Sequence, residues 1–121
     1  MPLYESAEDY LERILMLEET LGVNNVHSID IANSFSYSKA SVSVAMKHLR
    51  EQSLITFSKT GEISLTPKGR EIAANIYERH QVLTKWIMSL GVSKEIAEKD
   101  ACKVEHDLSQ ETYDAVKKIC R

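Results

Sequence analysis

The segment from residue 28 to residue 65 constrains the fold more than any other part of this sequence. A short stretch with helical periodicity, 28–35, is followed by a tight turn and then by a longer helical stretch, 38–52. Two short segments in which apolar residues alternate with polar ones, 55–57 and 63–65, flank a turn that contains glycine, and they predict a β-hairpin. Short helix, turn, longer helix and hairpin are typical of a winged helix-turn-helix.

Helices are predicted on both sides of this segment. A first helix opens at Ser6 and stops at Gly22, with Leu21 among its inward-facing residues. A long helix follows Thr66-Pro67, passes His80 and ends before Leu90-Gly91, and Ser93 and Ser109 then cap two further helices. We therefore expect a mainly α chain with an N-terminal winged helix-turn-helix at 1–66 and a C-terminal helical dimerisation domain at 67–121.

Length and composition limit the class of protein. A chain of 121 residues makes one or two small domains, which are expected to gain stability as a homodimer. No apolar run is long enough to cross a membrane, and the acidic N-terminus is unlike a secretory signal. Cys102 and Cys120 make no disulfide framework, so free thiols in a reducing cytoplasm are expected.

The charge is distributed unevenly although the net charge is only −3. Residues 1–25 carry six acidic residues and one arginine, whereas residues 26–70 carry six lysines and arginines and three acidic residues. A basic middle beside an acidic flank indicates a DNA-reading module joined to a cation-binding one.

The N-terminal part of the longer helix is the expected DNA-reading surface. Its small residues permit close approach to base edges, its hydroxyls and helix terminus suit phosphates, and nearby cations add salt-dependent affinity. The alternative is that Ser38 and Ser41 are only caps and Lys39 only a solvated charge. The predicted DNA-binding residues are Ser38, Lys39, Ala40, Ser41, Ser43, Val44, Lys47, Arg50 and Lys59.

Near the C-terminus, Cys102, Glu105 and His106 stand at positions i, i+3 and i+4. On a helix these side chains project from one face within one turn. Sulfur, oxygen and nitrogen donors at one point are the ligand mix of a first-row transition metal. The alternative is a surface glutamate and histidine beside a small buried cysteine.

Three further residues extend this donor set. Asp9 and Glu12 share a face of the first predicted helix, although Ser6 and Asp9 also fit a capping box. His80 falls on the apolar side of the long helix, where a lone histidine is usually a satisfied core residue. With them, the donors suffice for one octahedral site or two adjacent sites.

The sequence resembles the diphtheria toxin repressor family of metal-dependent transcription regulators, in particular its short manganese transport regulator branch. The resemblance covers nearly the whole chain. It is carried by Glu8-Asp9-Tyr10-Leu11-Glu12, Asp30-Ile31-Ala32, Ala40-Ser41-Val42-Ser43, Leu65-Thr66-Pro67-Lys68-Gly69, Arg79-His80, Leu90-Gly91-Val92 and residues 102–109. It implies a homodimer that binds operator DNA when loaded with a divalent metal and represses metal-uptake genes.

The resemblance also implies the metal ligands, and one of them departs from the manganese branch. Asp9, Glu12, His80, Glu105 and His106 match that branch, which has glutamate where this chain has Cys102. The iron-responsive branch has cysteine there but methionine at the position of Asp9. Mn²⁺ or Fe²⁺ is therefore the expected cofactor, with Co²⁺, Ni²⁺ or Zn²⁺ able to bind in vitro.

Two other functions are weighed against this one. An enzyme with a cysteine nucleophile and a histidine base lacks any oxyanion-hole or glycine-rich loop signal in the sequence. A metal-independent winged-helix regulator, whose C-terminal helices only dimerise, is the main alternative. It predicts that a chelator leaves DNA affinity unchanged.

Overall fold

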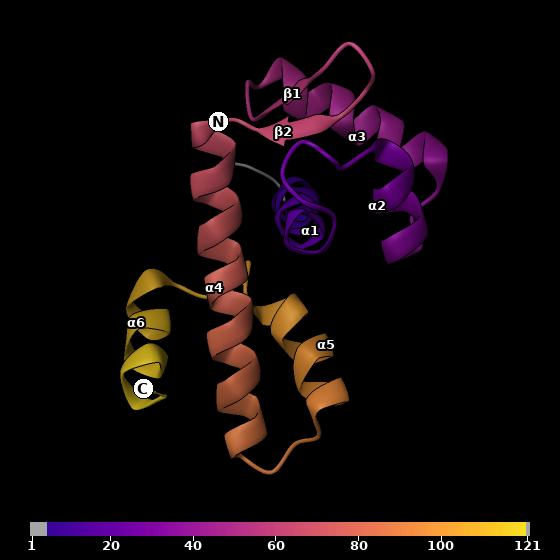
Figure 1. Ribbon diagram of the computed structural model, residues 1–121. Helices are drawn as coiled ribbons and strands as arrows, with labels where there is room; N and C mark the ends of the chain where they lie inside the picture. The colour runs from indigo at the N-terminus through magenta and orange to yellow at the C-terminus, as the bar shows by residue number, and fades with distance from the viewer. Residues whose placement is uncertain (1–4, 121) are drawn as a thin grey trace. The chain divides into compact units, whose positions relative to one another are not determined.

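The computed structural model describes residues 5–120 (Figure 1). It divides into two compact units, Met1–Ala74 and Asn75–Arg121, called here the N-terminal and the C-terminal unit. The long helix α4 (Pro67–Ser89) begins in the first unit and continues in the second. No helix among residues 5–120 is long and apolar enough to cross a lipid bilayer.

The N-terminal unit is a winged helix-turn-helix, as predicted. Its elements are α1 (Glu5–Leu21), α2 (Ser28–Phe35), α3 (Lys39–Glu51), β1 (Ile55–Phe57), β2 (Ile63–Leu65) and the start of α4. Helix α1 starts at Glu5, so Ser6, at which we expected the helix to open, lies within it. Helix α3 begins after Ser38, whose hydroxyl accepts a hydrogen bond from the Ser41 amide at 3.0 Å.

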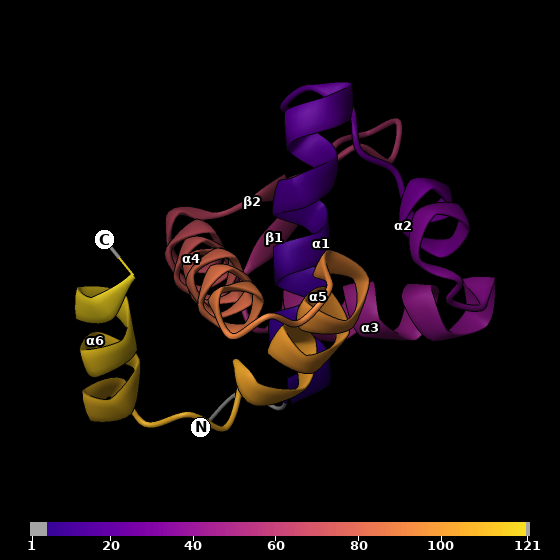
Figure 2. The ribbon, with the colours of Figure 1, turned by 90° about the horizontal axis from the view of Figure 1, so that it is seen from below.

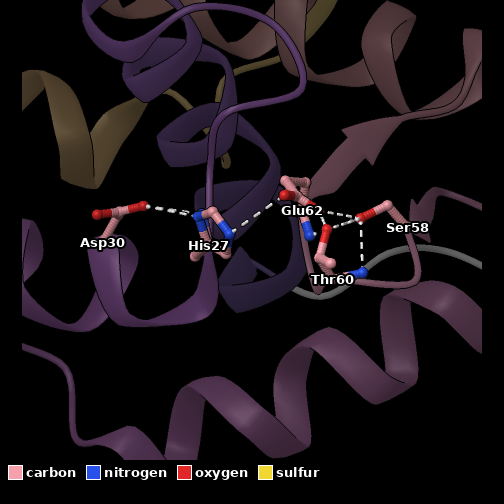
Figure 3. A network of polar contacts seen from close by, with 5 residues as sticks. All are labelled: His27, Asp30, Ser58, Thr60 and Glu62. Carbon is pink, nitrogen blue, oxygen red and sulfur yellow. Dashed lines mark hydrogen bonds and ion pairs between the residues drawn. The ribbon is translucent and has the colours of Figure 1, made fainter.

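The wing is an antiparallel hairpin in which Thr56 pairs with Ser64 at the centre. The Ile63 amide also donates to the Val26 carbonyl at 2.7 Å, which ties the hairpin to the segment before α2. The polar network in Figure 3 adds a second tie, since His27 Nε2 lies 3.7 Å from Glu62 Oε1. These contacts fix where the wing lies relative to the helix-turn-helix.

Hydrogen bonds at the tip of the wing hold its shape (Figure 3). The hydroxyls of Ser58 and Thr60 both donate to the Glu62 carboxylate, and the Ser58 amide donates to the Glu62 carbonyl at 2.9 Å. These hydroxyl bonds lower the pKa of Glu62 to about 2. Gly61 turns the chain with φ = 90°, a conformation that suits glycine.

A continuous hydrophobic core holds this unit together. It contains fifteen buried side chains, and each fully buried leucine or isoleucine contributes roughly 1.5–3 kcal/mol. Leu11 and Ile14 of α1 are fully buried. Leu21, which we expected to face inward, is 40% exposed, because it is the last residue of α1.

Close packing fixes the start of α4. The Thr66 hydroxyl caps the helix by accepting from the Gly69 amide at 3.1 Å. At Gly69 the helix passes so close to the residue before β1 that an added Cβ would lie 2.0 Å from the Leu54 carbonyl oxygen. Arg70 then binds both carboxylate oxygens of the buried Glu18, at 2.9 and 3.2 Å. The first turn of α4 is thereby locked to the winged helix.

The C-terminal unit consists of the rest of α4 with α5 (Lys94–Val104) and α6 (Gln110–Ile119), which lie on opposite sides of α4 (Figures 1 and 2). Ser93 and Ser109 cap α5 and α6, as predicted. The hydrophobic cluster contains only five buried residues. Polar contacts supplement it, because the Tyr113 hydroxyl of α6 donates to Glu78 of α4 at 3.0 Å.

Candidate metal centre and nucleic-acid interface

The C-terminal unit brings three predicted metal ligands together. His80 lies in the middle of α4 and Cys102 in the last turn of α5. Glu105 is the residue directly after α5 and caps its C-terminus. His80 Nδ1 lies 3.0 Å from Glu105 Oε2 and 3.7 Å from Cys102 Sγ. One donor atom from each of these residues lies within 4.8 Å of the others, so a single ion could contact all three.

The charges at this cluster fit a bound cation. Glu105 is fully buried, and its Oε1 accepts no hydrogen bond from the described residues. Hydrogen bonds to Cys102 and then to Glu105 raise the pKa of His80 to about 10, against the opposing effect of burial. The ring nitrogen thus lies between the Glu105 carboxylate and the Cys102 sulfur, a position that a divalent metal would also favour. The donor set is one that first-row transition metals bind.

His106 follows Glu105 directly and is almost as well shielded from solvent. Its Nε2 lies 3.5 Å from Glu105 Oε1, and its side chain is 2% exposed. The C-terminal unit therefore gathers two imidazoles, one carboxylate and one thiol. Both cysteines are free, as expected, but Cys120 is at the end of α6 and belongs to the hydrophobic packing there.

Arg79 is a residue of this centre to which the sequence assigned no role. Its guanidinium donates to the main-chain carbonyls of Glu105 at 3.1 Å and Leu108 at 2.7 Å, and to the Gln110 side chain at 3.0 Å. It also lies over the Tyr113 ring, 4.9 Å from the centroid. Arg79 thus holds the segment that carries the Glu105 ligand. The sequence shows that Arg79 stands beside His80. It does not show which main-chain carbonyls the Arg79 side chain binds.

The remaining two predicted ligands, Asp9 and Glu12, are on α1 in the N-terminal unit. They stand one helical turn apart, as predicted, and Glu12 is only 1% exposed. A glutamate that solvent does not reach needs compensation for its charge. Their participation in the metal centre stays a prediction.

The predicted DNA-binding residues are all exposed. Helix α3 buries Val42, Met46 and Leu49 on one face, so the opposite face is left to solvent. That face presents hydroxyls near the N-terminus of the helix and cations farther along it. Lys59 is exposed in the turn of the wing. The helix and the wing can both approach a nucleic-acid duplex without rearrangement of the core.

Helix α3 and the wing share a hollow of about 320 Å³, lined by Ser43, Val44, Lys47, Arg50 and Phe57. Arg50 lies over the ring of Phe57, with its guanidinium carbon 5.7 Å from the centroid. Phe57 was not among the predicted site residues, because an aromatic residue in a strand is usually part of the core. Its half-buried ring packs against the core and also forms part of the hollow, which is bordered by cations.

Two family profiles match nearly all of the chain. The "Iron dependent repressor, N-terminal DNA binding domain" matches residues 2–63, and the "Iron dependent repressor, metal binding and dimerisation domain" matches residues 66–121. The two units found in the structure thus correspond broadly to the two parts of one family architecture.

Relatives and solved structures agree with this match. The chain is 35% identical to the transcriptional regulator MntR of Salmonella typhimurium over 111 residues, which are 92% of this chain and 69% of that protein. It is 34% identical to the HTH-type transcriptional regulator MntR of Geobacillus kaustophilus, covering 92% of this chain and 77% of the relative. The structure of the manganese regulator SloR superposes with a TM-score of 0.82 and 27% identity.

The SloR match covers 93% of this chain but 52% of the SloR chain, so the present chain spans about half the length of that structure. The profile matches argue against the enzyme alternative, because the family consists of DNA-binding regulators. With a winged helix-turn-helix, a clustered donor set and two matching profiles, the chain belongs to the iron-dependent repressor family.

Proposed function

We propose that this protein is a metal-dependent transcriptional repressor that binds operator DNA as a homodimer when loaded with Mn²⁺ or Fe²⁺. The observation that carries the proposal is the convergence of His80, Cys102 and Glu105 in a chain with an exposed recognition helix. Genes of metal uptake in the same cytoplasm are the proposed targets, since their repression by bound metal would close a feedback loop.

The proposed ligand set has six members. Four of them rest on the geometry of the C-terminal unit, and the two on α1 rest on the sequence resemblance. They are Asp9, Glu12, His80, Cys102, Glu105 and His106. Carboxylates suit manganese, whereas the thiolate favours later metals such as iron, cobalt, nickel or zinc. The family is named for iron and the SloR relative for manganese, so both ions are retained as candidates.

The mechanism follows from where the ligands stand in the chain. Asp9 and Glu12 belong to the DNA-binding unit and the other ligands to the dimerisation unit. A bound divalent ion would supply positive charge that offsets the carboxylates of both. The arrangement of units in which both sets of ligands share an ion would then be favoured. In a dimer, that arrangement sets the spacing of the two recognition helices, which must match half-sites about one turn of DNA apart.

Proton release accompanies this assembly. Cys102 binds metal as a thiolate and His80 as a neutral ring, so each must lose any proton that it carries. Because the pKa of His80 is raised to about 10, its ring is protonated near neutral pH without metal. Metal affinity is therefore expected to fall as the pH is lowered.

DNA recognition is assigned to α3 and the wing. Lys39, Lys47 and Arg50 on α3, with Lys59 on the wing, would contact phosphates and give a salt-dependent affinity. The N-terminus of α3, where Ser38 and Ser41 expose their hydroxyls, suits a further phosphate. The side chains in the first two turns of α3 would face the base edges.

The test compares DNA binding with metal and with chelator. Duplexes are first selected from a random-sequence library by the protein in Mn²⁺, and affinity is then measured in Mn²⁺, in Fe²⁺ under anaerobic conditions, and in a chelator. We expect metal to raise affinity by between about 5-fold and 150-fold. Glu105→Gln should abolish this increase while leaving a folded dimer.

The matched control is Glu98→Gln, which changes an exposed carboxylate of the same helix α5. It should leave the metal response intact. Equal affinity in metal and in chelator would contradict the proposal and would support a metal-independent winged-helix regulator instead.

A further inference from the structure

Helix α3 exposes one large apolar side chain on its outer face. Among the described residues of α3, Val44 is the only large hydrophobic residue that is exposed, with 58% of its surface accessible. The exposed residues one helical turn before and after it are Ala40, Ser41, Lys47 and His48. Valine also forms helices less readily than alanine, so local helix formation does not account for it.

The residues around Val44 indicate which kind of partner could cover its side chain. Val44 and the Phe57 ring contribute apolar surface to the hollow of about 320 Å³ shared by α3 and the wing. Lys47 and Arg50 border the same hollow, and Arg50 lies over Phe57. Apolar surface bordered by cations suits a partner that presents a small apolar group close to negative charges.

In duplex DNA, thymine is the base that presents a small apolar group close to negatively charged phosphates. In the major groove, the C5-methyl group of thymine is the apolar feature among the donors and acceptors of the base edges. Phosphates flank it on both sides. We propose that Val44 contacts a thymine methyl group in each operator half-site, with Lys47 and Arg50 directed to phosphates. The inference rests on the proposed DNA-binding function and names a base that it reads.

The chemistry of valine fits this task. In a helix the β-branched side chain adopts essentially one rotamer, so its two methyl groups are presented in a fixed position. Little conformational entropy is lost on contact, in contrast to a long flexible side chain. Burying one methyl group corresponds to about fourfold in affinity per half-site, and a symmetric dimer would apply this factor twice.

The test removes the methyl group from the DNA and the valine from the protein. In a duplex selected by the wild-type protein in Mn²⁺, each thymine is replaced in turn by deoxyuridine, which lacks only the C5-methyl. At one position per half-site we expect an affinity loss of about fourfold with the wild type. With Val44→Ala the same replacement should have no effect, and that variant should bind the wild-type duplex about as weakly as the wild type binds a duplex with uridine at this position in both half-sites.

Two further variants keep the result interpretable. Val44→Thr retains one methyl group on the same branched carbon and should show part of the thymine preference. Ser43→Ala changes the adjacent exposed residue in the same hollow and should keep the full uridine effect. Melting temperatures of all variants are measured, and Val44→Ala is expected to fold because alanine favours helices.

The outcomes separate this inference from the function on which it rests. If wild type and Val44→Ala bind the selected duplex with the same steep salt dependence and respond identically to every uridine, the thymine contact is wrong while DNA binding stands. If Val44→Ala binds every duplex more weakly than the wild type by the same factor, whichever thymine is replaced, Val44 packs against the DNA backbone. The inference is then likewise overturned. Failure of the wild type to select or bind any duplex would overturn both.

Discussion

The two units of this chain are built in different ways. The N-terminal unit closes around fifteen buried hydrophobic residues, whereas the C-terminal unit buries five in its cluster and uses polar contacts as well. Both units leave large apolar side chains exposed. They are Leu21, Val23, Ile29 and Val44 in the N-terminal unit and Met88, Leu90, Ile96, Val104 and Ile119 in the shorter C-terminal unit.

This contrast bears on how each unit would carry out the proposed function. The continuous core of the N-terminal unit suits a surface that must be presented rigidly to DNA. The C-terminal unit instead buries the Glu105 carboxylate against the His80 ring. Under the proposed function, a second copy of the chain would cover the exposed apolar side chains of this unit, and a bound cation would balance the charge of Glu105.

The first prediction tests the rigidity of the N-terminal unit. Gly69→Ala should destabilise the protein by at least about 3 kcal/mol, because the new methyl would collide with the Leu54 carbonyl and the backbone must move. The free energy of unfolding in urea is the measurement. Gly91→Ala is the control, since its added methyl meets nothing within 4 Å. It should cost only about 1 kcal/mol for its left-handed conformation.

Equal losses in the two glycine variants would mean that α4 is not locked to the winged helix. The contrast between the larger hydrophobic cluster of the N-terminal unit and the smaller one of the C-terminal unit would then lose its clearest structural consequence.

The second prediction concerns Arg79 in the C-terminal unit. Arg79→Lys should weaken metal affinity by about 10-fold to 100-fold, the usual effect of losing hydrogen bonds behind metal ligands. Lysine keeps the charge but cannot bridge the carbonyls of Glu105 and Leu108 with one planar group. Co²⁺ titration followed by visible absorption measures both affinity and coordination. Lys85→Ala, at an exposed position of the same helix, should leave both unchanged.

If Arg79→Lys lowers the stability of the metal-free protein but leaves the Co²⁺ spectrum and affinity unaltered, Arg79 is only a packing residue. The metal centre would then owe its geometry to α4 and α5 alone.

The third prediction concerns Cys102, where the sequence departs from the manganese branch. Cys102→Glu should retain the Mn²⁺ response and lower the preference for Fe²⁺, Co²⁺ or Zn²⁺ over Mn²⁺ by about tenfold, because the soft donor is lost. The half-buried Cys102 Sγ lies against the His80 ring, which supports a ligand role. Competition titrations give the ranking. A well-folded variant with an unaltered ranking would show that the sulfur does not bind the metal.

The order and type of the elements followed from the sequence because local signals agreed with one another. Ser38, Ser93 and Ser109 each cap the helix expected of them, and Thr66 precedes the long helix as predicted. The start of the first helix differs from the prediction. Helix α1 begins at Glu5, before Ser6, although Ser6 has the chemistry of a cap.

The donor cluster was predictable only in part. The spacing of Cys102 and Glu105 within one helical turn is local information, whereas the approach of His80 depends on how α4 and α5 pack. The hydrogen bonds of Arg79 to two carbonyls belong to the same nonlocal class. Main-chain atoms leave no trace in residue types, so no sequence pattern could have assigned this role.

The last prediction returns to the N-terminal unit and has the smallest effect. If Lys47 contacts a phosphate, Lys47→Ala should reduce the slope of log affinity against log salt concentration by about one. The loss should be similar for selected and unrelated duplexes, because phosphates carry no sequence information. Metal affinity should stay at the wild-type value, since Lys47 is an exposed residue of α3 and none of the proposed ligands is on that helix. Lys99→Ala, an exposed lysine of α5, should change neither quantity. Equal losses of DNA and metal affinity in Lys47→Ala would mean that the two units do not divide these tasks, since a surface reserved for DNA can lose a charge without disturbing a buried metal centre.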